Sequence, residues 1–248
     1  MQYFGGKAKV GKHIADYINT NRQAGQSYWE PFVGGAWIMY RVLPVGPRIG
    51  SDVCAPLIAL YQKLQEGWQP PQAVTEEDYA RAKAGLVEPY MQAFIGFGCS
   101  FAGKWFGGFA RQAGYNFARG SGSSLLKKAA FMGDVVFRHQ NYLDAPPIKN
   151  AVIYCDPPYT GTTGYSAAPK YRPEEFWNAC RAWAAQGNTV LVSEYAAPPD
   201  FELVLEIATH TQIRNGANVR EKRTEKLFLL DDLRMRANGG VAYEVEVA

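Results

Sequence analysis

A four-residue motif follows an apolar stretch in the second half of the chain. Asp156-Pro157-Pro158-Tyr159 comes directly after residues 151–155, which the apolar run predicts to be a fully buried strand. In open α/β sheets, ligands bind outside the carboxyl ends of strands, so the motif is placed for a site. Its carboxylate and proline-interrupted backbone offer acceptors but few donors, because proline has no N–H. These groups suit an incoming NH₂ group.

Acceptors of this kind would activate an amine. Two hydrogen bonds, to Asp156 and to the Pro157 carbonyl, would draw the nitrogen lone pair out of conjugation with its ring and make the nitrogen more nucleophilic. Tyr159 offers an aromatic face for the base. A proline-rich turn without function is the alternative, but chance would produce this tetrapeptide in about one in a thousand chains of this length. The catalytic candidates are therefore Asp156, Pro157 and Tyr159.

A second candidate site is the glycine turn at residues 30–35, Glu-Pro-Phe-Val-Gly-Gly. It lies between a predicted strand at 27–32 and a predicted helix at 36–43, and its glycines let a ligand approach the backbone. Asp52 ends the next predicted strand, near the spacing of about 20 residues at which an acidic side chain meets a ribose. The turn lacks GxGxxG and the sequence has no P-loop. A ligand with an adenosine but no pyrophosphate, such as S-adenosylmethionine, fits better than NAD or ATP.

Alternating strands and helices must position these motifs. The apolar periodicity predicts helices at 55–64 and 173–186 and strands at 48–52, 151–155, 189–193, 201–213 and 225–230, with an antiparallel edge strand at 241–247. This order predicts an α/β protein with a mixed sheet.

Residues 58–134 interrupt the alternation and predict an inserted subdomain, which leaves residues 1–57 and 135–248 as the catalytic domain. Between positions 89 and 133 the chain has basic and aromatic residues but no Asp or Glu, and residues 120–124, Gly-Ser-Gly-Ser-Ser, are expected to form a flexible loop. This segment and the basic loop before the last strands predict a surface for double-stranded DNA. The expected DNA contacts are Lys104, Arg111, Asn116, Arg119, Lys127, Lys128, Arg220, Lys222 and Arg223.

The composition argues against a metal-binding, disulfide-rich or membrane-spanning protein. The chain has 248 residues with 26 Lys+Arg against 23 Asp+Glu, a net charge of +3 that is too small by itself to indicate a polyanionic partner. The four cysteines and three histidines are far apart, so neither a zinc site, a disulfide framework nor metal catalysis is expected. We therefore expect a reducing, cytoplasmic compartment. No run of 18 apolar residues occurs, so no membrane span is expected.

Taken together and in this order, three motifs strongly resemble the Dam-type (D12 class, alpha group) DNA adenine-N6 methyltransferases. They are YFGGK at 3–7, EPFVGG at 30–35 and CDPPY at 155–159, and further matches are spread over most of the chain at 49–52, 57–61, 192–193 and 223–228. The resemblance implies a Rossmann-like sheet, S-adenosylmethionine as methyl donor and a helical target-recognition insertion. The implied product is N6-methyladenine in duplex DNA.

The resemblance also implies roles for single residues. Phe4 and Lys7 would line the methionine end of the donor, and Asp52 would bind its ribose. Positions 156–159 would hold the target adenine. The donor pocket would be completed by Glu30, Phe32, Gly34 and Gly35. The insertion departs from the family, with Gly107-Gly108 in place of Asn-Gly before Arg111 and Tyr-Asn-Phe-Ala at 115–118 in place of Phe-Asn-Val-Pro. The recognition sequence therefore cannot be carried over, and no restriction endonuclease counterpart can be deduced.

Three other functions stay open. The same acceptors would serve another planar amine, such as cytosine N4, RNA adenine or a protein amide, because Asp156 favours adenine through the resemblance alone. A non-catalytic DNA-binding relative is possible, although such a protein need not keep Asp156 and Tyr159. A nicotinamide dehydrogenase could also carry the βαβ unit with Asp52, but the incomplete glycine motif counts against it.

Overall fold

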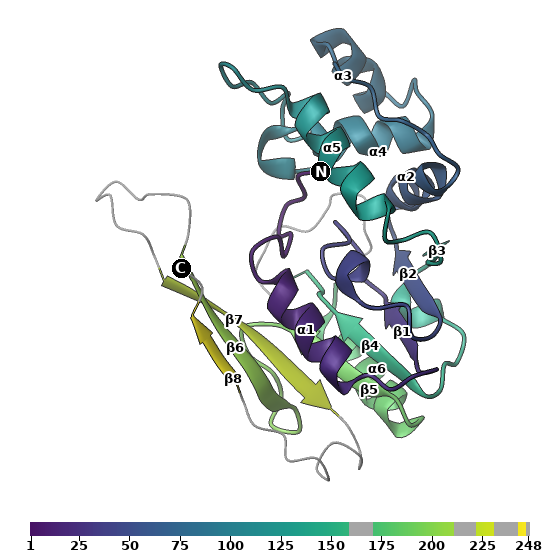
Figure 1. Cartoon of the computed structure of the whole chain (residues 1–248), viewed down its shortest axis with the longest axis vertical. Helices are drawn as coiled ribbons and strands as arrows, with labels where there is room; N and C mark the ends of the chain where they lie inside the picture. Colours follow the sequence, from purple (N-terminus) through teal and green to yellow (C-terminus); the bar gives the residue numbers. More distant parts are fainter. Residues whose placement is uncertain (159–170, 211–221, 231–242, 247–248) are drawn as a thin grey trace.

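The computed structural model describes residues 1–158, 171–210, 222–230 and 243–246. Within these residues, eight strands form one sheet in the order β3-β2-β1-β4-β5-β7-β6-β8 (Figure 1). The strands are β1 Ser27–Glu30, β2 Arg48–Asp52, β3 Val136–His139, β4 Ala151–Cys155, β5 Thr189–Ser193, β6 Glu202–His210, β7 Lys222–Leu230 and β8 Tyr243–Glu246. Strands β3, β2, β1, β4 and β5 are parallel, and β7 runs antiparallel between β5 and β6. This mixed, Rossmann-like α/β sheet confirms the predicted fold class.

The strand order reverses beside β1, the position at which open α/β sheets form a ligand-binding crevice. The chain runs outward from β1 through β2 to β3, and then returns to the other side of β1 as β4. The connections that leave β1 and β4 therefore diverge at the carboxyl edge of the sheet, which is where ligands bind in open α/β folds. Residues 30–35 follow β1 and Asp156 follows β4. The fold therefore brings both sequence motifs to this edge.

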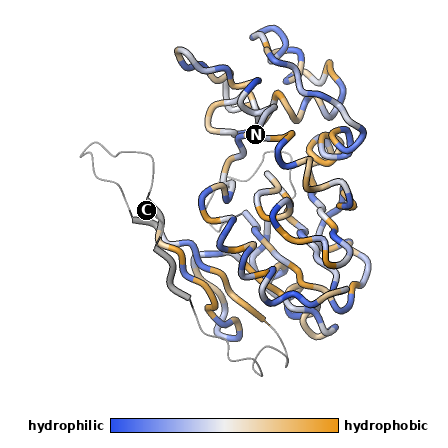
Figure 2. The backbone as a smooth tube through the Cα atoms, viewed as in Figure 1, coloured by the Kyte–Doolittle hydropathy of each residue, from blue (hydrophilic) through white to orange (hydrophobic). Residues whose placement is uncertain are grey.

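Helices cover both faces of the sheet. Residues alternate along each strand, so Tyr28 and Tyr154 pack with α1 (Gly11–Asn21) and α2 (Ala55–Gln65), while Trp29 and Ile153 pack with α6 (Pro173–Ala185). Figure 2 shows the apolar stretches gathered along the strands and the facing sides of these helices. The result is a three-layer core that holds the strand ends rigidly.

The inserted segment is helical, as expected. It forms α3 (Glu76–Lys83), α4 (Pro89–Gly98) and α5 (Phe117–Ala129), which lie together at one end of the molecule (Figure 1). Their buried side chains belong to the same apolar cluster as those of α1 and α2. The expected boundary after position 57 falls inside α2, and the division into two domains stays a prediction. Among the described residues no helix is long and apolar enough to cross a membrane.

The predicted helix at 36–43 is wrong. The chain instead forms turns and a short 3₁₀ helix, Met39–Arg41. Gly34 and Ala36 have positive φ angles of 43° and 52°, and such left-handed residues break a right-handed helix. The helix α1 was not predicted, although Ile14, Ala15 and Ile18 have helical spacing and are buried.

The predicted flexible loop at 120–124 is also wrong, because these residues lie inside α5. The small residues are needed for packing. A Cβ on Gly120 would lie 2.3 Å from the Tyr115 hydroxyl oxygen, and Ser121 donates a hydrogen bond to the Gly98 carbonyl at 2.8 Å. A third correction concerns β8, which pairs with β6 in the parallel direction and not as an antiparallel edge strand.

Arg48 joins three parts of the structure. Its guanidinium is buried and donates to the Met39 and Val42 carbonyls at 3.1 and 2.7 Å and to the Phe131 carbonyl at 2.7 Å. It also pairs with Asp134. Because Arg48 is on β2 and Phe131 follows α5, this side chain fastens the inserted helices to the sheet.

We expect Arg48→Met to lower the free energy of unfolding by about 3 kcal/mol, because buried carbonyls and one carboxylate lose their donor. Urea denaturation followed by circular dichroism measures the change. Arg181→Met is the matched control, since Arg181 pairs with Asp200 at the surface, where both side chains are 41% exposed. That control is expected to cost less than about 1 kcal/mol. Equal midpoints for the two variants would contradict the fastening role of Arg48.

Candidate functional site

Strand alternation places five polar side chains on the α1 face, towards the carboxyl ends of the strands. Glu30 has the same parity as Tyr28 on β1, and Glu225 the same parity as Leu227 on β7, whose side chain packs on that face. The Tyr28 hydroxyl donates to Glu30 Oε1 at 2.6 Å, and the Tyr154 and Ser193 hydroxyls lie 2.9 Å apart. Lys7, just before α1, reaches into the same group.

Lys7 pairs with two acidic side chains, one directly after β4 and one on β7. Its Nζ lies 2.8 Å from Asp156 Oδ1 and 3.2 Å from Glu225 Oε1, and its side chain is 8% exposed. Burial alone would lower the pKa of Lys7, but the charges of Asp156 and Glu225, with hydrogen bonds to both, outweigh it and raise the pKa. Lys7 is therefore an ammonium that holds the Asp156 carboxylate at the end of β4. The expected contact of Lys7 with the methionine end of a donor stays a prediction.

Glu30 is a buried carboxyl group beside these charges. Burial raises the pKa of Glu30 to about 8; the Tyr28 hydrogen bond opposes the shift, and the nearby charge of Asp156 adds to it. Glu30 therefore carries a proton over most of the neutral range. A neutral carboxyl group can donate one hydrogen bond as well as accept others.

The glycine turn is fixed from several sides. Asp52 Oδ2 accepts from the Gly34 N–H at 3.0 Å and its Oδ1 from the Cys54 N–H at 2.9 Å, while the Tyr61 hydroxyl donates to the Gly34 carbonyl at 2.6 Å. The Asp52 side chain thus supports the turn, in addition to the expected role toward a ribose. Burial raises the pKa of Asp52, and the two backbone hydrogen bonds oppose the rise. The turn is held in a fixed shape at the edge of the crevice.

The other residues expected to bind the donor or target have different surroundings. Phe4 is 41% exposed and lies under the Lys104 ammonium, 4.7 Å from Nζ to the ring centroid. Phe32 packs against Tyr142 at 5.0 Å between ring centroids, on the α6 side. Pro157 is buried after Asp156. Tyr159 lies outside the described residues.

One expected DNA contact requires correction. Lys128 is 2% exposed and donates to the Gly35 carbonyl of the glycine turn, so it does not belong to an exposed basic surface. Burial, with the nearby charge of Arg41, lowers the pKa of Lys128 to about 7. The sequence showed two adjacent lysines, but on a helix adjacent residues face different directions. Lys127 is exposed, as a phosphate contact requires.

Of the other expected DNA contacts, those in the inserted segment are exposed and have differing partners. Lys104 and Arg119 are exposed, whereas the guanidinium of Arg111 pairs with Glu76 of α3 at 2.5 Å. Asn116 caps α5, accepting from the Arg119 N–H at 2.9 Å. Lys222 and Arg223 begin β7, and Arg220 lies outside the described residues. A basic surface on α5 therefore contains Arg119 and Lys127.

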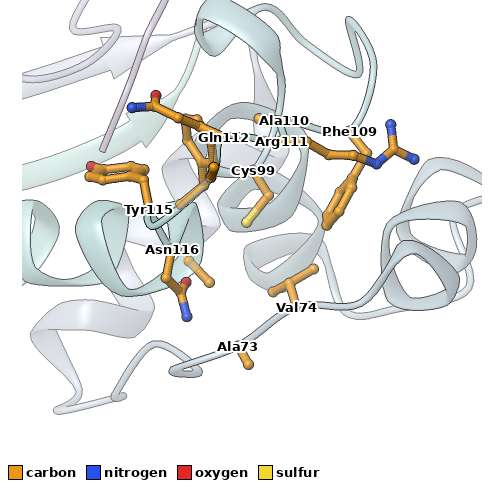
Figure 3. Close-up of a pocket in the computed structure, with 12 residues that line it drawn as sticks. Ala73, Val74, Cys99, Phe109, Ala110, Arg111, Gln112, Tyr115 and Asn116 are labelled. Atoms are coloured by element: carbon orange, nitrogen blue, oxygen red, sulfur yellow. The ribbon is translucent and has the colours of Figure 1, made fainter.

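A cavity of about 580 Å³ lies in the inserted segment, away from the strand ends. Figure 3 shows Tyr115 and Asn116 on one side of it and Phe109 on the other, with Val74 beneath. The cavity is partly apolar, and it lies beside the residues expected to read DNA. Nothing in its geometry connects it to Asp156.

Two members of the site were not predicted from the sequence. Glu225 lies in the segment 223–228 that resembles the family, and Tyr28 lies in the predicted strand at 27–32, but neither residue was predicted to belong to the site. Both have a signal in the sequence, because alternation places them on the α1 face. The pairing of Glu225 with Lys7 depends on β7 lying next to β5, which residue spacing cannot show.

A known protein family matches the part of the chain that contains Lys7, the glycine turn and Asp52. Residues 3–89 match the D12 class N6 adenine-specific DNA methyltransferase family. The match contains YFGGK, the glycine turn and Asp52, and it confirms the resemblance stated from the sequence over these residues. It supports methyl transfer as the reaction. No curated protein matches the chain.

Several solved structures are distantly similar. A candidate rRNA methylase from Clostridium thermocellum is 12% identical with a TM-score of 0.42, covering 92% of this chain and 99% of that chain. A candidate RNA methyltransferase from Pyrococcus horikoshii is 10% identical with a TM-score of 0.43, covering 93% and 85%. Magnesium protoporphyrin IX methyltransferase from Synechocystis, a structure with bound SAM, is 11% identical with a TM-score of 0.37, covering 90% and 81%. At these scores the fold assignment depends on the strand order described above.

The raised pKa of Glu30 predicts a pH dependence of stability. The carboxyl group has a pKa of about 8 when folded, against a usual value of 4.5. Between these values the folded state binds more protons than the unfolded state, so this group makes the free energy of unfolding fall as pH rises from 4.5 to 8. Glu30→Gln keeps an acceptor for Tyr28 and cannot ionise. We expect the variant to gain stability relative to wild type across this window, by up to a few kcal/mol.

Urea denaturation at pH 5, 6, 7 and 8 measures the difference between the two proteins. Glu77→Gln, which removes an exposed carboxyl group, is the control for the general change in charge. Parallel pH profiles for wild type and Glu30→Gln would contradict a buried, protonated Glu30.

Proposed function

We propose that this protein transfers a methyl group from S-adenosylmethionine to the exocyclic N6 of adenine in a specific short sequence of duplex DNA. The family match supports methyl transfer, and its family description names this base. The crevice beside β1 supports a ligand at the carboxyl edge of the sheet. Asp156 supports the choice of an amine as acceptor, because its oxygens accept hydrogen bonds from an NH₂ group.

The single observation that carries the donor assignment is the charge at the strand ends. Asp156 and Glu225 both pair with Lys7, and Asp52 lies at the end of neighbouring β2. Three acidic side chains at this edge favour a ligand with a cationic centre such as a sulfonium. It disfavours the pyrophosphate of a dinucleotide, which binds at helix N-termini or glycine nests. The dehydrogenase alternative therefore has little support from the site.

The residues at the crevice fit S-adenosylmethionine. The glycine turn at 30–35 and Asp52 would hold the adenosine part, and Glu30, with its proton, would face polar groups of the donor. When bound, the donor supplies an electrophilic methyl group. Asp156 and the Pro157 carbonyl accept from the target amine and orient its lone pair, while Lys7 fixes the Asp156 carboxylate. A carboxylate has lone pairs for both partners, so the ion pair and the amine contact are compatible.

The target base must leave the duplex to reach Asp156. An amine in a Watson–Crick pair is enclosed by the helix, and enzymes acting on such atoms extrude the nucleotide at a cost of a few kcal/mol. We assign Tyr159 as the stacking face, since base–aromatic stacking contributes about 1–3 kcal/mol. The proton released from the amine is expected to pass to solvent after methyl transfer, without a dedicated general base.

Methylation of cytosine N4 or of RNA adenine is the second candidate function. It is favoured by the same observation, since the acceptors at Asp156 and Pro157 do not by themselves distinguish one planar amine from another. A non-catalytic DNA-binding relative would keep the basic surface without transferring a methyl group. One product analysis separates these three functions.

The donor assignment predicts stabilisation by S-adenosylhomocysteine, the demethylated donor, in the absence of metal. At about 100 times its dissociation constant the compound should raise the free energy of unfolding by roughly 2.7 kcal/mol, because it binds only the folded state. Differential scanning fluorimetry with chelator present measures the shift. NAD at the same concentration is the control. Stabilisation by NAD and none by S-adenosylhomocysteine would overturn the donor assignment.

The catalytic assignment predicts that Asp156→Ala loses methyl transfer and still binds DNA. Losing a contact that strengthens in the transition state should lower the single-turnover rate about 10²–10³-fold. The assay incubates unmethylated plasmid DNA or total RNA with isotopically labelled donor and identifies methylated nucleosides by mass spectrometry. Asp200→Asn, a change of an exposed carboxylate 41% accessible to solvent, is the control. N4-methylcytosine or methylated RNA would favour the second candidate, and no product with wild type would favour the non-catalytic one.

A further inference from the structure

A buried contact joins the inserted helices to the glycine turn. The Lys128 side chain on α5 donates to the Gly35 carbonyl, and its Nζ lies 3.5 Å from the centroid of the Trp37 ring. At 2% exposure, the Lys128 amino group is removed from water and has one carbonyl and two aromatic rings as neighbours, the second ring being Tyr40 at 5.9 Å. Lys128 and Gly35 are 93 residues apart in the sequence.

Trp37 extends the contact to the segment that precedes α1. A Cβ built on Gly6 would lie 2.6 Å from Trp37 Nε1, and one built on Gly35 would lie 2.9 Å from Trp37 Cδ1. The ring therefore touches the backbone beside Lys7 and the backbone of the glycine turn, while Lys128 lies against it. Both donor-side motifs and α5 thus meet at one tryptophan.

The opposite side of α5 is free to contact DNA. Arg119 and Lys127 are exposed on this helix, and Lys127 is the immediate neighbour of Lys128. On a helix these neighbours point about 100° apart, so one lysine reaches solvent and the other the core. A displacement of α5 on binding DNA would therefore act on the Gly35 carbonyl directly, because Lys128 is bonded to it.

We propose that Lys128 is a positioning residue that couples DNA binding on α5 to donor binding at the glycine turn. The inference rests on the proposed function, since it needs both ligands. DNA held by Arg119 and Lys127 fixes α5, and Lys128 then holds residues 34–35 and Trp37 in the arrangement that binds the donor. By linkage, each ligand raises the affinity of the other by the same factor. A lysine that only fills space would stabilise the fold without this coupling.

The test measures the dissociation constant of S-adenosylhomocysteine by calorimetry, with and without saturating unmethylated plasmid DNA, on the full chain. For wild type we expect binding to tighten about 5–150-fold in the presence of DNA. In Lys128→Met, which keeps the length and loses the donor and the charge, the ratio should fall to within about twofold of one. The matched control Lys127→Met should weaken DNA binding and keep the wild-type ratio.

Each outcome decides a separate claim. A wild-type ratio in Lys128→Met, or a ratio of one in wild type, would overturn the coupling while leaving donor binding and methylation intact. Absence of S-adenosylhomocysteine binding by wild type without DNA would instead overturn the proposed function, and the coupling with it. If Lys128→Met does not fold, Trp37→Phe removes part of the contact, and it should lower the ratio; an unchanged ratio there would also overturn the proposal.

Discussion

The ion pair between Lys7 and two carboxylates is the interaction on which the candidate site depends. It ties the segment before α1 to Asp156 after β4 and to Glu225 on β7. A buried ion pair contributes little net stability, because desolvation of the charges offsets their attraction, but removing one partner leaves the others uncompensated. The main effect of this ion pair is therefore to fix the positions of the two carboxylates. Asp156 is held at the end of β4, although the prolines that follow it cannot donate backbone hydrogen bonds.

Much of this arrangement could be predicted from the sequence. Apolar runs predicted β4 and β5, because buried parallel strands have such runs. The strands β1 and β2 were predicted together with the glycine turn that follows β1 and the carboxylate that ends β2. Each candidate motif was placed at the end of one of these strands. The glycine turn was recognised because it joins a strand to the next segment and is followed by Asp52. Asp156 was recognised because the tetrapeptide that it begins is rare by chance. The strand order then brings these motifs to the same edge, as the βαβ rule anticipates.

The errors have a common physical cause, since they occur where tertiary contacts override local preference. Residues 36–43 are apolar like a helix, but Ala36 has a left-handed conformation in a turn held by Asp52 and Tyr61. Gly120 looks like a loop residue but lies inside α5, where a Cβ would meet the Tyr115 hydroxyl. Lys128 looked like a phosphate contact, and its partner is the carbonyl of Gly35. Local periodicity carries no information about partners so distant in the sequence.

Charged side chains at the strand ends and on α5 have opposite signs. Acidic side chains lie at the strand ends, where the proposed donor and a neutral amine would meet, and the exposed Arg119 and Lys127 lie on α5. Bringing DNA phosphates to the first region would place like charges together, whereas the second region attracts them. In the proposed function, a target base would pass from α5 to the strand ends while its phosphates stay with Lys127 and its neighbours. Extrusion of a single nucleotide would meet that requirement, because a base is neutral.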